Sequence, residues 1–107
     1  MSSDPAAPYE QLARMIEHEL ELVNEGRYAE LAEAVTRRGA ALASLTIPEP
    51  ESAQPAMMRA RALHERLLVD TLRAREELAR SIGHLKRLRR AAGGYRHSVT
   101  RRYSTTA

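Results

Sequence analysis

The chain has 107 residues, of which 43% are hydrophobic and 29% charged, with a formal net charge of +3 and no cysteine. This length suits one small domain with a modest core, and the lack of cysteine excludes disulfide bonds and thiolate metal ligands. Residues 1–55 carry four basic and ten acidic side chains, whereas residues 56–107 carry thirteen basic and four acidic ones. Such a split favours two halves that pack on each other, or a face that meets a charged partner.

The first residues predict a cytoplasmic protein. They contain neither the basic stretch nor the apolar run of a signal peptide. No apolar segment approaches the roughly 18 residues needed to cross a bilayer. We therefore expect no membrane insertion.

The first predicted helix covers about residues 8–25. Pro8 suits its first turn, where an N–H would have no partner, and Gly26 can end it in the left-handed conformation. The apolar residues recur at spacings of three and four, which is the helical period: Tyr9, Leu12, Ile16, Leu20 and Val23. Glu17, Glu19 and Glu21 are interpreted as a solvated face, because residues two apart cannot form one paired-carboxylate site.

The second predicted helix covers about residues 28–45. Its apolar face is interrupted by Arg38, which we expect to act with Arg37 as a cap or a surface pair. The connection between the two helices is so short that it predicts an antiparallel hairpin. The residues of the apolar face are Tyr28, Leu31, Val35, Leu42 and Leu45.

A proline-rich loop at 46–55 precedes a long third helix, predicted at about 56–92. Gly83 is its weak point and could kink or divide it, and Gly93 with Gly94 is expected to end it, leaving residues 93–107 as a basic, flexible tail. The apolar positions keep a 3-4 spacing: Met57, Ala60, His64, Leu67, Thr71, Ala74, Leu78, Ser81, Leu85 and Leu88. The predicted fold is all-α, a single domain over 1–107 in which the hairpin packs on the third helix as a three- to four-helix bundle.

The lengths of these helices suggest a function. The hairpin helices would each be about 26 Å long and the third about 55 Å, so the hairpin covers only part of it. The uncovered part carries an apolar stripe, Leu78, Ile82, Leu85 and Leu88, bordered by Arg80, Lys86, Arg87, Arg89 and Arg90. Such a stripe predicts another surface, which is a second copy of the chain, a client helix, or a short helix folded back from the tail.

Two segments carry a family resemblance. The run ELELVNEGRYAEL at 19–31, followed by TRRGAALASL at 36–45, resembles the helical hairpin of flagellar type III export chaperones, the FliT/FlgN group. The proline-rich break, the long third helix and LRRAAGGY at 88–95 are similar to that family in order and length. The resemblance covers about residues 9–95.

The resemblance implies a small cytoplasmic chaperone for protein transport. Such proteins bind the C-terminal helices of filament-cap or hook-associated subunits, prevent their premature assembly and deliver them to the export gate and its ATPase complex. The client would then contact Leu78, Ile82, Leu85, Leu88, Arg89 and Tyr95. The plainer interpretation of these leucines is ordinary bundle core.

Other functions are predicted less strongly. The cluster at 86–90, with Arg96, Arg101 and Arg102 and two interleaved tyrosines, could bind nucleic acid, but the acidic hairpin would repel a duplex. A generic dimeric helical adaptor is the other alternative. We expect no enzyme, since no active-site pattern such as that of a helical chorismate mutase is found. No two of the four histidines have the spacing of ligands on one helical face, so neither a metal nor a cofactor is predicted.

Overall fold

The computed structural model describes the backbone of residues 4–104 and the side chains of residues 4–94. Over this range the chain is helical and contains no strand, which confirms the all-α prediction. The elements are α1 (Ala7–Glu25), α2 (Tyr28–Ala43), a short 3-10 helix η1 (Glu51–Ala53) and α3 (Gln54–Ser104). None of the described helices is long and apolar enough to cross a membrane.

The chain divides into two units, which we call unit 1 (Met1–Ala74) and unit 2 (Arg75–Ala107). Unit 1 contains α1, α2, η1 and the first part of α3, and unit 2 contains the rest of α3. The sequence predicted a single domain over 1–107. Each unit is described by itself below.

The turn between α1 and α2 is built on Gly26. Its φ of 73° is left-handed, a conformation in which a Cβ is disfavoured. The N–H of Gly26 donates to the carbonyl of Val23 at 3.1 Å, and the N–H of Arg27 donates to that of Leu22 at 2.9 Å. These bonds satisfy carbonyls at the end of α1, so the chain reverses within two residues and begins α2 at Tyr28.

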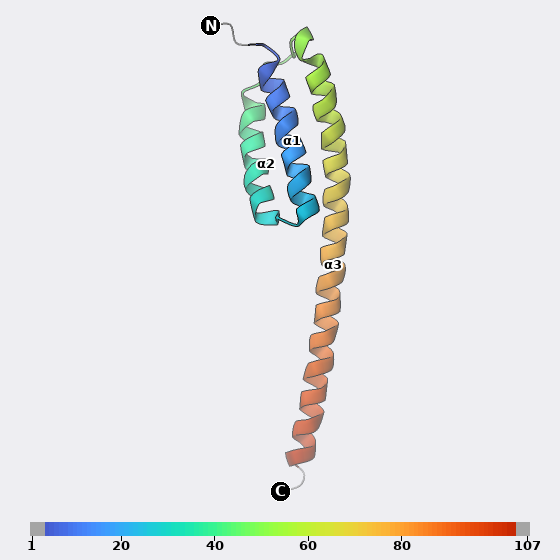
Figure 1. Ribbon diagram of the computed structural model, residues 1–107. Helices are drawn as coiled ribbons and strands as arrows, with labels where there is room; N and C mark the ends of the chain where they lie inside the picture. The colour runs from blue at the N-terminus through green and yellow to red at the C-terminus, as the bar shows by residue number, and fades with distance from the viewer. Residues whose placement is uncertain (1–3, 105–107) are drawn as a thin grey trace. The chain divides into compact units, whose positions relative to one another are not determined.

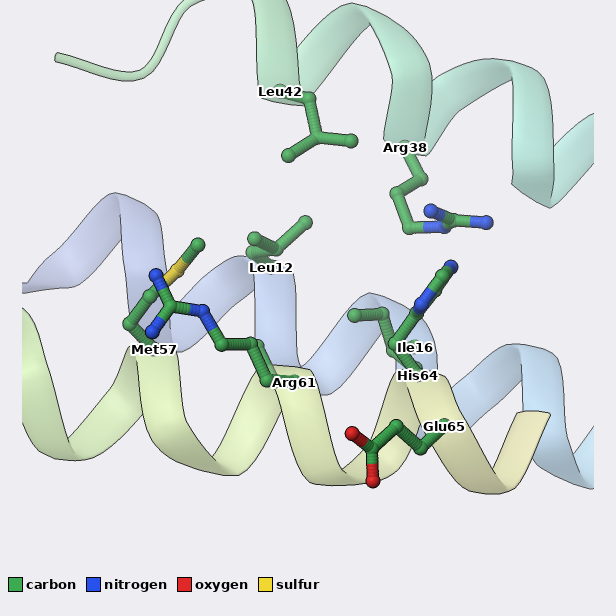
Figure 2. Close-up of a pocket in the computed structure, with 9 residues that line it drawn as sticks. Leu12, Ile16, Arg38, Leu42, Met57, Arg61, His64 and Glu65 are labelled. Atoms are coloured by element: carbon green, nitrogen blue, oxygen red, sulfur yellow. The ribbon is translucent and has the colours of Figure 1, made fainter. Parts of the chain in front are cut away.

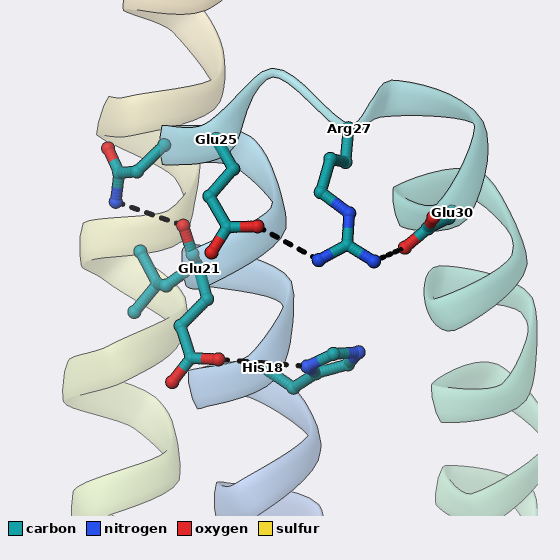
Figure 3. Close-up of polar contacts among 7 residues, drawn as sticks. His18, Glu21, Glu25, Arg27 and Glu30 are labelled. Atoms are coloured by element: carbon teal, nitrogen blue, oxygen red, sulfur yellow. Dashed lines mark hydrogen bonds and ion pairs between the residues drawn. The ribbon is translucent and has the colours of Figure 1, made fainter.

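Arg27 joins the two helices at this turn (Figure 3). Its guanidinium donates to Glu25 at 2.9 Å and also to Glu30 in the first turn of α2. The hydrogen bonds to Glu25 and Glu30 raise the pKa of Arg27 above its ordinary value. Arg27 therefore stays charged, and the bridge persists wherever both carboxylates are ionised.

Helix α1 is the centre of unit 1, lying between α2 and the first part of α3 (Figure 1). Eight residues of α1 are buried, whereas α2 buries only Ala34. Polar contacts reinforce the contact between α1 and α3, since Arg59 donates to Glu17 at 2.8 Å. The core cluster consists of Leu12, Ala13, Ile16, Leu20, Val23, Ala60 and Leu67.

The linker between α2 and α3 is tied back to α1. Helix α2 ends at Ala43, two residues before its predicted end, and the linker includes the η1 turn within the predicted loop. The hydroxyl of Tyr9 donates to the carbonyl of Thr46. Ala53 in η1 is fully buried beside Tyr9. These contacts anchor the start of α3 to the start of α1.

Helix α3 differs from the prediction at its end, because it continues past residue 92 to Ser104. It runs through Gly83, Gly93 and Gly94, none of which has a positive φ. A glycine inside a helix costs about 1 kcal/mol relative to alanine, and it ends a helix only when its backbone turns left-handed. Most of the predicted tail at 93–107 is therefore helical backbone, and residues 105–107 lie outside the described range.

Candidate functional site

A buried ion pair joins α1 to α2. The Nε–H of Arg38 donates to Oε2 of Glu19 at 2.8 Å, with 15% of the Arg38 side chain and none of the Glu19 side chain exposed. The other oxygen of Glu19, Oε1, has no hydrogen-bond partner among the described residues. A carboxylate out of contact with water needs a partner such as Arg38, since an unpaired buried charge costs several kcal/mol.

This pair corrects two predictions from the sequence. Glu19 was assigned to a solvated face with Glu17 and Glu21, but it is fully buried. Arg38 was assigned to a cap or surface pair, but it is mostly buried against Glu19. The sequence did contain a sign of this ion pair. Glu19 and Arg38 each lie at a spacing of three and four from apolar residues of their helix, and their charges are opposite.

Arg38 also lines a groove in unit 1, which we call the unit 1 groove (Figure 2). Leu12 and Ile16 of α1 form its floor, and Arg38 and His64 point toward one another across it from α2 and α3. Its volume is about 360 Å³. The full lining is Leu12, Ile16, Arg38, Leu42, Met57, Ala60, Arg61, His64 and Glu65.

The groove exists because α2 packs on α1 along one narrow face. Tyr28, Val35 and Leu42 belong to the stripe that the sequence predicted as the apolar face of α2, and all three are exposed. The apolar face of α2 is thus only partly covered within unit 1. An apolar floor beside an arginine and a histidine suits an apolar group with a nearby hydrogen-bond acceptor.

Unit 2 presents a different surface, which we call the unit 2 stripe and define as Leu78, Ile82, Leu85 and Leu88. These side chains are between 43% and 55% exposed. Within unit 2 they follow one another at spacings of three and four, so they lie along one side of α3. Four large apolar side chains gathered on one side of a helix are an unusual surface feature.

Basic residues accompany this stripe. At about 100° per residue, Lys86 and Arg89 lie along one border and His84 along the other, whereas Arg80 lies about 140° around the helix from Leu85. All four side chains are exposed. The two acidic residues of this unit, Glu76 and Glu77, stand at its beginning. The surface therefore combines an apolar strip with one basic edge.

The structure places most of the predicted site residues together. Leu78, Ile82, Leu85 and Leu88 form the stripe, and Arg89 lies on its border. Tyr95 belongs to α3, but its side chain lies outside the described residues.

The described part of the chain contains no candidate metal site. No group of three or more His, Cys, Asp or Glu side chains that could hold a metal ion occurs there. Comparison with known proteins adds no relative, since no family model, no curated protein and no solved structure matches this chain.

Proposed function

We propose that this protein binds an amphipathic helical segment of a client protein on the unit 2 stripe and keeps that segment from assembling prematurely. The supporting observation is the half-exposure of Leu78, Ile82, Leu85 and Leu88 at helical spacing. A client helix placed there buries apolar area on both surfaces, at about 25 cal/mol per Å² before the cost of ordering. No covalent step is needed.

The resemblance to flagellar type III export chaperones names the client class in this proposal. The client is a filament-cap or hook-associated subunit, bound in the cytoplasm and delivered to the export gate or its ATPase complex. The exposed stripe supports this role because such a chaperone works by reversible cover of an amphipathic segment. Arg89, on the border of the stripe, supplies a charged contact at the edge of the bound helix.

The test uses purified full-length chain and purified cap and hook-associated subunits from the same genome. Gel filtration and calorimetry measure binding by the native chain and by a Leu85→Asp/Leu88→Asp variant. The matched control is Ala79→Asp/Ala91→Asp, which adds the same charge to the same segment on the side away from the stripe. We expect the first variant to lose at least about tenfold in affinity, while the control binds normally.

Nucleic-acid binding is the competing outcome. Duplex DNA binding would fall steeply with added salt, because it depends on phosphate neutralisation, whereas burial of apolar surface is much less sensitive. Binding of DNA but of no subunit, unaffected by Leu85→Asp/Leu88→Asp, would overturn the proposed function. Equal loss in the stripe variant and its control would also contradict it.

A further inference from the structure

The apolar positions of α3 repeat every seven residues. Ala60 and Leu67 are seven apart and both are buried in unit 1, and Leu78 and Leu85 have the same separation in unit 2. In a straight helix, residues seven apart are offset by about 20°, so a seven-residue repeat slowly winds around the helix. The repeated residues stay along one line of contact only when two helices coil around each other. A lipid surface imposes no such period. The spacing therefore favours a helix as the occupant of the unit 2 stripe.

The borders of the stripe indicate the charge of that helix. Positions beside the apolar seam of a coiled coil face the partner and set partner choice. Here they include Arg89, with Lys86 beside it, on one side of the stripe. Acidic residues opposite them would form pairs across the contact, and basic residues there would be repelled.

The same charges argue against a second copy's stripe as the occupant. Residues 75–107 carry nine basic and two acidic side chains, a net charge of +7, whereas residues 1–74 carry eight basic and twelve acidic ones, a net charge of −4. Two unit 2 stripes placed face to face would bring two strongly positive segments together. The unit 2 stripe of a second copy therefore satisfies the period but not the charge.

We propose that the unit 2 stripe selects an acidic amphipathic helix, one with apolar residues at heptad spacing and Glu or Asp beside them. This inference rests on the proposed function, since it names the chemistry of the client that the stripe binds. Selectivity comes from the basic border formed by Lys86 and Arg89, and affinity comes from the leucines. The two contributions can therefore be separated by substitution.

The experiment uses two synthetic helical peptides of about three heptads with the same leucine seam. One has Glu at every flanking position and the other has Lys. Fluorescence anisotropy with the full-length chain at about 0.1 M salt should show the Glu peptide binding at least tenfold more tightly, with a preference that shrinks as salt rises. Leu85→Asp/Leu88→Asp should abolish binding of both peptides.

Charge reversal is the sharper test. Lys86→Glu/Arg89→Glu replaces both basic residues of the charged border and should transfer the preference to the Lys peptide. The matched control is Arg37→Glu/Arg73→Glu, which makes the same change in net charge at exposed positions of unit 1 and should leave the preference for the Glu peptide unchanged.

Each remaining outcome has a distinct meaning. Equal binding of both peptides, still lost in Leu85→Asp/Leu88→Asp, would overturn the acidic selectivity while leaving helix binding intact. Failure of both peptides, together with no client binding, would overturn the inference and the proposed function. A dimer in sedimentation that Leu85→Asp/Leu88→Asp dissociates would identify a second copy as the occupant and overturn the inference. Binding to anionic vesicles in place of the Glu peptide would do the same.

Discussion

Arg38 on α2 donates its Nε–H to Oε2 of Glu19 on α1 at 2.8 Å, inside an otherwise apolar contact between two helices. The carboxylate is fully buried and the guanidinium nearly so. Attraction between two such charges is offset by the cost of removing both from water. The pair is therefore expected to specify how the hairpin aligns more than it stabilises the fold.

Breaking this pair from one side should be costly. Arg38→Met leaves the Glu19 carboxylate buried without its partner and should lower the free energy of unfolding by about 3–5 kcal/mol. The double variant Glu19→Leu/Arg38→Met removes both charges and should recover most of that loss. Urea denaturation, monitored by circular dichroism, measures the free energy of unfolding of the native chain and of the two variants. A double variant as unstable as Arg38→Met alone would show that the pair is a net stabiliser.

The turn at Gly26 should tolerate few residues. Gly26→Ala forces a Cβ into a left-handed conformation and should cost about 1–2 kcal/mol. Gly26→Asn should cost less, because asparagine enters this region more readily. Thermal denaturation of the two variants checks the order. Since no neighbouring atom lies within 4 Å of the added Cβ, a clash cannot explain a loss.

Leu67 and Leu85 test the difference between core and surface leucines on α3. Leu67 is 4% exposed and packs in the unit 1 core, so Leu67→Ala should cost about 2–5 kcal/mol. Leu85 is 55% exposed, so Leu85→Ala should change the free energy of unfolding by no more than about 0.5 kcal/mol. Chemical denaturation of both variants provides the measurement. A loss of several kcal/mol in Leu85→Ala would make the stripe part of a core.

Gly83 should be replaceable by alanine. A Cβ there would meet only the Nη1 atom of Arg87, at 4.0 Å, so Gly83→Ala should favour the helix by about 1 kcal/mol and raise the helical circular dichroism signal. Gly83→Pro should lower that signal, because proline removes a hydrogen bond and clashes with the preceding turn. Gly39→Ala is the matched control in α2, where a Cβ meets nothing within 4 Å. A weaker signal in Gly83→Ala than in the native chain would contradict a regular helix at this position.

Much of the helical pattern follows from local chemistry, and the sequence predicts it well. The start of α1 differs from the prediction by one residue, and α2 begins at Tyr28 as predicted. The left-handed Gly26 is confirmed. The end of α3 was predicted less well. A glycine pair ends a helix only when one glycine adopts the left-handed conformation, and the sequence does not show whether it does.

The sequence by itself determined that this chain is helical, where α1 and α2 meet, and that one face of α3 is apolar, because periodicity, turn chemistry and proline act through neighbouring residues. Only the tertiary structure decided which apolar and charged residues are covered. Leu67 and Leu85 occupy the same kind of position in the repeat, yet one is buried and the other is exposed. Glu19 is buried where its neighbours suggested a solvated face. Spacing assigns a residue to a face of a helix, but its burial depends on what packs against that face.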